Sequence, residues 1–183
     1  VVAYGQSYTL PEPGITPESP LYFLDLWDEK LRLLFTRSDM AQFRRYTAIA
    51  EERLAETDVL AGKGIAATQV SLQQYRVTAP LLFAASERLT DKTFTIDALR
   101  MALDHLAVLD HISERTDADK KQFIRETKKF IIDQQLQTLS SFAKQQPEDA
   151  LRIFGDAVQR RMDRIREVAI DKENNEEALN EYA

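Results

Sequence analysis

The sequence predicts an all-α fold, a bundle of about six helices with a central antiparallel helical hairpin. Apolar residues recur at intervals of three and four along most of the chain, which is the spacing of one helix face. The 183 residues include only five Gly and six Pro, too few for a fold built on many tight turns. A chain of this length can form one core without disulfides or metal, burying roughly 70% of the surface that its unfolded form exposes.

We expect three segments along the chain. Residues 1–19 contain Pro11, Pro13 and Pro17, and because proline fixes φ and restricts the residue before it, this leader should be extended. We interpret it as a tether rather than a Pro-rich ligand. Residues 20–170 form the helical bundle. Residues 171–183 are acidic and polar, and form either a C-terminal tail or an extension of the last helix.

The first predicted helix runs from Pro20 to Phe35, with Ser19 as its N-cap. One face of this helix carries the only tryptophan in the chain, in the series Leu24, Trp27, Leu31 and Leu34. We expect the later helices to cover this face, so that the rest of the chain is organised around it.

The second and third helices form the predicted hairpin. Ser38 or Asp39 can cap the second helix, which runs to about Ala61. The short turn Gly62-Lys63-Gly64, with a left-handed glycine, makes the third helix its antiparallel neighbour. The third helix has a regular coiled-coil-like seam made by Ile65, Thr68, Leu72, Tyr75, Ala79, Leu82, Ser86 and Leu89. Pro80 lies inside this helix, and we expect a kink from Arg76 to Pro80.

Three more helices complete the prediction. Thr95 caps a fourth helix that runs to about Arg115, and a fifth follows from Asp117 to about Gln145. Apolar residues cover more than half of the circumference of the fifth helix, which makes it the best candidate for the centre of the bundle. The sixth helix begins at Pro147. Its apolar stripe is narrow, which places the helix on the outside of the bundle. The stripe is formed by Leu151, Phe154, Val158, Met162, Ile165 and Val168.

The sequence offers no catalytic, cofactor-binding or metal-ligating residues that we can assign. Its two histidines, His105 and His111, point about 120° apart on one helix, so they cannot share a metal, and we expect each to be structural or solvated. No Glu-x-x-His, His-Glu-x-x-His, Gly-x-Ser-x-Gly or glycine-rich phosphate motif occurs. The pairs Glu51-Glu52 and Glu176-Glu177 are interpreted as solvated faces.

Charge and composition exclude further classes. The net charge of −6 works against sequence-independent attraction to nucleic acid. The absence of cysteine excludes disulfides and thiolate chemistry, and no apolar run approaches the roughly 18 residues of a membrane span. Four basic residues cluster on one side of the fifth helix: Lys121, Arg125, Lys128 and Lys129. They could bind an anion, although a solvated helix end is the favoured interpretation.

Two stretches together resemble a bacterial family of unknown function. These are Pro17-Glu18-Ser19-Pro20-Leu21-Tyr22 and the helical Ala50-Glu51-Glu52-Arg53-Leu54-Ala55-Glu56. In that family a Pro-Gly-Ser/Asp-Pro-Leu-Tyr start leads into amphipathic helices, and here Glu18 stands where glycine is usual. The resemblance covers roughly residues 17–75. It implies a secreted or membrane-anchored helical protein, and it carries over no catalytic residues.

The leading expectation is a non-enzymatic, extracytoplasmic interaction or scaffold module with a protein partner in the cell envelope. The start at Val1 agrees with a removed signal peptide or anchor, and equally with a truncated expressed fragment. The alternative is a small-ligand-binding or sensor domain with a pocket near the Pro80 kink. An enzyme is the least favoured class, because no nucleophile and base pair can be assembled. The sequence leaves the oligomeric state open.

Overall fold

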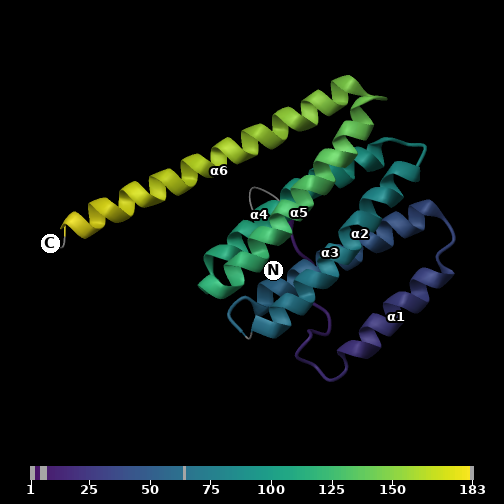
Figure 1. The fold of residues 1–183 in the computed structure, drawn as a ribbon, viewed down its shortest axis with the longest axis horizontal. Helices are drawn as coiled ribbons and strands as arrows, with labels where there is room; N and C mark the ends of the chain where they lie inside the picture. The colour runs from purple at the N-terminus through teal and green to yellow at the C-terminus, as the bar shows by residue number, and fades with distance from the viewer. Residues whose placement is uncertain (1–2, 5–7, 64, 182–183) are drawn as a thin grey trace. The chain divides into compact units, whose positions relative to one another are not determined.

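The computed structural model describes residues 3–4, 8–63 and 65–181, and it confirms the all-α fold. Two-residue strands in the leader precede the helices (Figure 1). Within the described residues the helices are α1 (Tyr22–Phe35), α2 (Asp39–Leu60), α3 (Ile65–Arg88), α4 (Thr93–Glu114), α5 (Ala118–Ala143) and α6 (Pro147–Glu181).

The chain divides into two compact units. The first, Val1–Ser141, contains α1 to α4 and nearly all of α5. The second, Phe142–Ala183, contains α6. This last helix continues as far as Glu181, through the acidic residues that end the chain. The core described below belongs to the first unit.

The core of the first unit is the predicted α2–α3 hairpin with α4 packed against both helices. The α3 seam is buried as predicted at Thr68, Leu72, Tyr75, Ala79, Leu82 and Ser86. The side chain of Ile65 lies outside the described part. From α4, the core receives Ala98, Leu99, Ala102, Leu103, Val108, Leu109 and Ile112. Pro80 lies within α3 as expected.

The prediction that α5 is the central helix is wrong. Phe123 and Leu136 of α5 are exposed, whereas Leu99 and Leu109 of α4 are fully buried. α5 contributes Ile124 and Ile131 to the core, but it also turns polar side chains inward. Gln135 Nε2 donates to the Leu99 carbonyl at 2.9 Å. Part of its apolar surface therefore remains on the outside.

The leader belongs to the first unit. In it β1 (Ala3–Tyr4) pairs antiparallel with β2 (Tyr8–Thr9), with Tyr4 opposite Tyr8, and β1 packs against α4. Gly14 approaches α2 so closely that a Cβ at this position would overlap the Glu52 carboxylate. The described part of the leader thus packs against the helices at several points, at β1, Leu10 and Gly14, rather than being only a tether.

Helix ends agree with the prediction in part. Ser38 caps α2, its Oγ accepting from Ala41 N at 3.2 Å. Ser19 is not the cap of α1, because its Oγ accepts from Leu21 N and the helix starts at Tyr22. Gly62 does not have the expected left-handed φ, and Gly64 lies outside the described residues.

The start of α4 also differs. The helix begins at Thr93, where the Asp91 carboxylate accepts hydrogen bonds from the Thr93 amide and hydroxyl. Thr95 is therefore inside the helix, and its hydroxyl donates to the Ser86 carbonyl at 3.2 Å. The predicted capping residue instead connects α4 to the end of α3.

Candidate functional site

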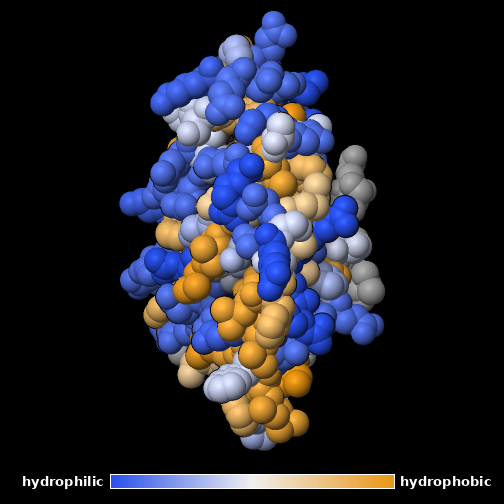
Figure 2. All heavy atoms as spheres, turned by 90° about the vertical axis from the view of Figure 1, so that its right-hand side faces the viewer, coloured by the Kyte–Doolittle hydropathy of each residue, from blue (hydrophilic) through white to orange (hydrophobic). Residues whose placement is uncertain are grey.

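Within the first unit the apolar face of α1 points to solvent, and the prediction that later helices cover it is wrong for α2 to α5. Six large side chains, which we call the α1 stripe, are between 46% and 78% exposed: Phe23, Leu24, Trp27, Leu31, Leu34 and Phe35. Trp27 is 66% exposed and Leu34 78%. Figure 2 views the molecule from the side on which α1 lies in Figure 1, and hydrophobic side chains gather in the lower part of this face. The helix thus exposes an apolar surface that would be expected to lie in the core.

The opposite face of α1 packs on α2 through polar side chains. Tyr22 is buried, and Asp25 and Glu29 are partly buried. All three contact the Arg53 side chain of α2: Tyr22 Oη accepts from Nη1 at 3.3 Å, Asp25 pairs with Nη2 at 3.4 Å, and Glu29 pairs with Nη2 as well. The guanidinium also lies 5.4 Å from the centre of the Tyr22 ring. Arg53 thus decides which face of α1 is turned inward.

Arg53 needs these partners because it is fully buried. A buried charge without partners costs several kcal/mol, since it loses its hydration. Glu56, one turn further along α2 and also fully buried, forms a third ion pair with the guanidinium. We call Arg53 with Asp25, Glu29 and Glu56 the Arg53 cluster. It fixes the orientation of α1.

The cluster carries more acidic than basic charge. Burial raises the pKa of Glu56 to about 7, although the Arg53 charge and a hydrogen bond from Ser71 lower it. Ser71 Oγ lies 2.7 Å from Glu56 Oε2. Burial likewise raises the pKa of Glu29 and Glu52. The Glu51-Glu52 pair, expected on a solvated face, is partly buried, because the leader and α1 pack over this side of α2.

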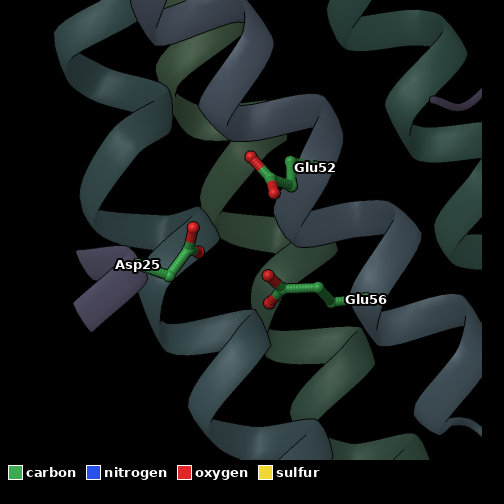
Figure 3. A group of neighbouring side chains, drawn as sticks. All are labelled: Asp25, Glu52 and Glu56. Atoms are coloured by element: carbon green, nitrogen blue, oxygen red, sulfur yellow. The ribbon is translucent and has the colours of Figure 1, made fainter. Parts of the chain in front are cut away.

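Three carboxylates of this region converge. Figure 3 shows Asp25 from α1 pointing toward Glu52 and Glu56 from α2, and one oxygen of each lies within 4.8 Å of the others. Oxygen donors so close together suit a hard cation. However, two of the three already pair with the Arg53 guanidinium, whose positive charge would oppose a metal ion. We therefore interpret the group as an ion-pair cluster.

His105 belongs to a buried polar network. Its Nδ1 lies 2.9 Å from Tyr75 Oη and its Nε2 lies 3.0 Å from Tyr8 Oη, while Tyr8 Oη donates to Glu51 Oε1 at 3.0 Å. Burial lowers the pKa of His105 to about 3 and raises the pKa of Tyr75. The imidazole is thus neutral and joins the leader to α2, α3 and α4. His111 is partly exposed, with Nδ1 3.9 Å from Glu114.

The surroundings of Pro80 contain little space. A cavity beside the helix turn before it is lined by Tyr75, Ala79, Leu82 and His105 among others, and its volume is about 10 Å³. This is room for about one water molecule, whereas ligand pockets are typically about 300–1,000 Å³. A larger hollow of about 350 Å³, open to solvent, lies between α3 and α5 and is lined by Gln69, Val70, Gln73, Gln74, Arg76 and Phe123.

The basic residues of α5 do not act as one group. Lys128 pairs with Asp110 of α4, whereas Arg125 and Lys129 are exposed. Lys120, which the sequence did not single out, is buried and donates to the carbonyls of Ala61 and Lys63 at 3.0 and 2.5 Å. It therefore stabilises the turn that joins α2 to α3.

A second exposed apolar face lies on α6. Leu151, Phe154, Val158, Met162 and Ile165 are all exposed, and we call them the α6 stripe. Val168, the last residue of the predicted series, lies outside the described side chains. The narrow face that the sequence indicates is thus present on α6 and open to solvent.

Comparison with known families identifies the family of the chain. The profile of a domain of unknown function, DUF5667, matches residues 14–182. The protein belongs to the DUF5667 family. Comparisons with curated proteins and with solved structures gave no match. Within the described part of this DUF5667 protein, no helix is both long and apolar enough to cross a membrane.

Proposed function

We propose that this DUF5667 protein is a non-enzymatic, extracytoplasmic interaction or scaffold module whose binding element is the α1 stripe. The observation that carries the proposal is the outward orientation of this stripe. It is held in place by ion pairs from the opposite face of the same helix to the buried Arg53.

The composition of the α1 stripe supports an interaction role. Monomeric proteins rarely expose contiguous apolar patches larger than a few hundred Å² without a function. Trp27 is the only tryptophan of the chain, and tryptophan is enriched among the residues that dominate binding energy at interfaces. Because the Arg53 cluster already orders the helix, a partner would not have to bear the entropic cost of folding it.

Two features support a non-enzymatic role. His105 is buried and held neutral in its network with Tyr75 and Tyr8, so it is poorly placed to exchange protons with a substrate. The cavity next to it has room for about one water molecule. The location outside the cytoplasm rests on the resemblance of residues 17–75 to secreted or anchored proteins.

Site-specific photo-crosslinking in the native organism tests the interaction role. A photoreactive phenylalanine analogue would replace Trp27, and the matched control would carry it at Val77, a 54% exposed residue of α3. We expect discrete crosslinked species from position 27 that the control does not give, with the crosslinked residues identified by mass spectrometry. Equal or absent crosslinking from both positions would contradict the proposal.

Cell fractionation tests the location separately. We expect the native protein in the envelope or medium fraction. A protein found only in the cytoplasmic fraction would overturn the extracytoplasmic part and leave the crosslinking result to decide the interaction role.

A further inference from the structure

The exposed residues of the α1 stripe have a spacing that reads the same in both directions. Their intervals along the chain are one, three, four, three and one, and Glu29 is the midpoint. Reversing the helix about this midpoint therefore exchanges apolar positions: Phe23 with Phe35, Leu24 with Leu34, and Trp27 with Leu31. When such a stripe pairs with a reversed copy of itself, apolar positions therefore face apolar positions.

Two such helices fit together when they run antiparallel. A twofold axis at the level of Glu29 would set Trp27 of one copy opposite Leu31 of the other. Leu24 would then approach the Leu34 and Phe35 end of the second helix, and every contact would occur twice, as an isologous interface requires. In a parallel pair the midpoint symmetry of the stripe would have no role.

The edges of the stripe allow this approach. Asp28 and Arg32 are neutralised by their own ion pair along the helix, with Arg32 Nε 2.6 Å from Asp28 Oδ2. Asp25 and Glu29 face Arg53 on the opposite side, so they are kept out of the contact. Lys30 is exposed on the other edge of the stripe. Charged side chains would therefore lie at the edges of the pair rather than at its centre, as in stable interfaces.

The stripe is also large enough. From their exposed fractions, its six side chains would bury on the order of 700 Å² per copy, against roughly 800 Å² per partner in standard stable interfaces. The pairing would require no change within the first unit, because all six side chains are already on its surface.

We propose that the α1 stripe is a twofold homodimer interface, in which α1 packs antiparallel against α1 of a second copy of the chain. This inference rests on the proposed role of α1 as the binding element and names its partner. A different helical protein could cover an apolar face, but only a second copy makes use of the midpoint symmetry.

Sedimentation velocity on the full chain over a range of concentrations is the first test. We expect a monomer–dimer equilibrium whose Kd rises at least tenfold in Trp27→Ser and Leu34→Ser. The matched control is Leu151→Ser, which removes an exposed leucine (71%) from the α6 stripe and should leave the Kd unchanged. A chain that is monomeric at every concentration, or a dimer lost only in the control, would overturn the proposal.

Disulfide trapping tests the orientation of the two helices. Because the chain contains no cysteine, no native thiol competes with the introduced ones. In an antiparallel pair, position 24 lies close to position 35 of the second copy, whereas the two copies of position 24 are about 15 Å apart along the axis. We expect an equal mixture of Leu24→Cys and Phe35→Cys to crosslink under mild oxidation while each variant alone does not. Efficient crosslinking of Leu24→Cys alone would indicate a parallel pair and contradict the proposal.

The two proposals fail in different ways. A strictly monomeric chain that still gives discrete crosslinks from position 27 to another protein would overturn the homodimer and support the interaction role. A monomeric chain without specific crosslinks from position 27 would overturn both.

Discussion

α1 and α3 have the same three-and-four spacing of apolar residues, yet one face is exposed and the other is buried. Leu72, Tyr75 and Leu82 of α3 are at most 3% exposed, whereas every member of the α1 stripe is at least 46% exposed. The difference lies on the side of α1 that is opposite its apolar face. α1 carries Asp25 and Glu29 there, and both reach the buried Arg53.

The ion pairs hold this side of α1 inward. Removing the partner of a buried charge costs about 3–5 kcal/mol, and this cost opposes any rotation of α1 that would take Asp25 and Glu29 away from Arg53. Because the carboxylates and the stripe lie on opposite sides of α1, turning Asp25 and Glu29 toward Arg53 turns the stripe away from α2. The comparison teaches that the ion pairs of one buried charge can set the orientation of an amphipathic helix. A second copy would satisfy both faces.

The largest effect is expected from removing the charge that orients α1. Arg53→Met leaves Glu56 buried and Asp25 and Glu29 partly buried without their cation, so we expect the free energy of unfolding to fall by about 3–5 kcal/mol. Chemical denaturation measures the loss, and hydrogen exchange should show faster exchange in α1. Arg32→Met, which breaks the exposed Asp28 pair, is the control and should cost less than about 1 kcal/mol. Equal losses in the two variants would contradict this account.

The same leucine truncation in the two helices tests the comparison directly. Leu72→Ala in the buried α3 seam should cost about 3 kcal/mol, because it creates a cavity in the core. Leu34→Ala in the α1 stripe should change stability by no more than about 0.5 kcal/mol. Urea denaturation at a concentration where the chain is monomeric gives both values, and a comparable loss in Leu34→Ala would show that the stripe is covered.

Glu56 should make stability depend on pH. Burial raises its folded pKa to about 7, above the ordinary glutamate pKa of 4.5, so the folded chain binds this proton more tightly than the unfolded one. The resulting stabilisation is fully present below about pH 4.5 and decreases as the pH rises to about 7. Between pH 5 and 7.5 we expect the wild type to lose on the order of 2 kcal/mol relative to Glu56→Gln, whose side chain does not titrate. A constant difference between the two proteins across this range would refute the assignment.

The smallest effect is expected in the network around His105. Tyr8→Phe removes the hydroxyl that bonds Glu51 and His105, and we expect a loss of about 1 kcal/mol. Thermal unfolding measures it, and α1 should keep its slow hydrogen exchange because the Arg53 cluster is intact. Loosening of α1 in this variant would show that the leader, rather than Arg53, holds the helix.

The residues missed by sequence reasoning are polar ones inside apolar faces. Arg53 follows Ala50 by three residues and precedes Thr57 by four, so its position on the inner face of α2 was a readable signal. The sequence did not show which carboxylates would pair with it. Asp25 lies 28 residues away, and such a pairing depends on how two helices pack. Lys120 was missed for the same reason, since its acceptors are backbone carbonyls of a distant turn.

By itself the sequence determined the all-α fold, the α2–α3 hairpin, the buried α3 seam and a cap of α2 at Ser38 or Asp39, because periodicity, caps and short turns act over a few residues. It also indicated apolar faces on α1 and α6. Only the tertiary structure decided that the α1 face points outward, that α4 lies in the core and that His105 is enclosed by two tyrosines. These features depend on which charges and hydroxyls meet across helices, because the cost of burying an unpaired charge is set by neighbours that are distant in the sequence.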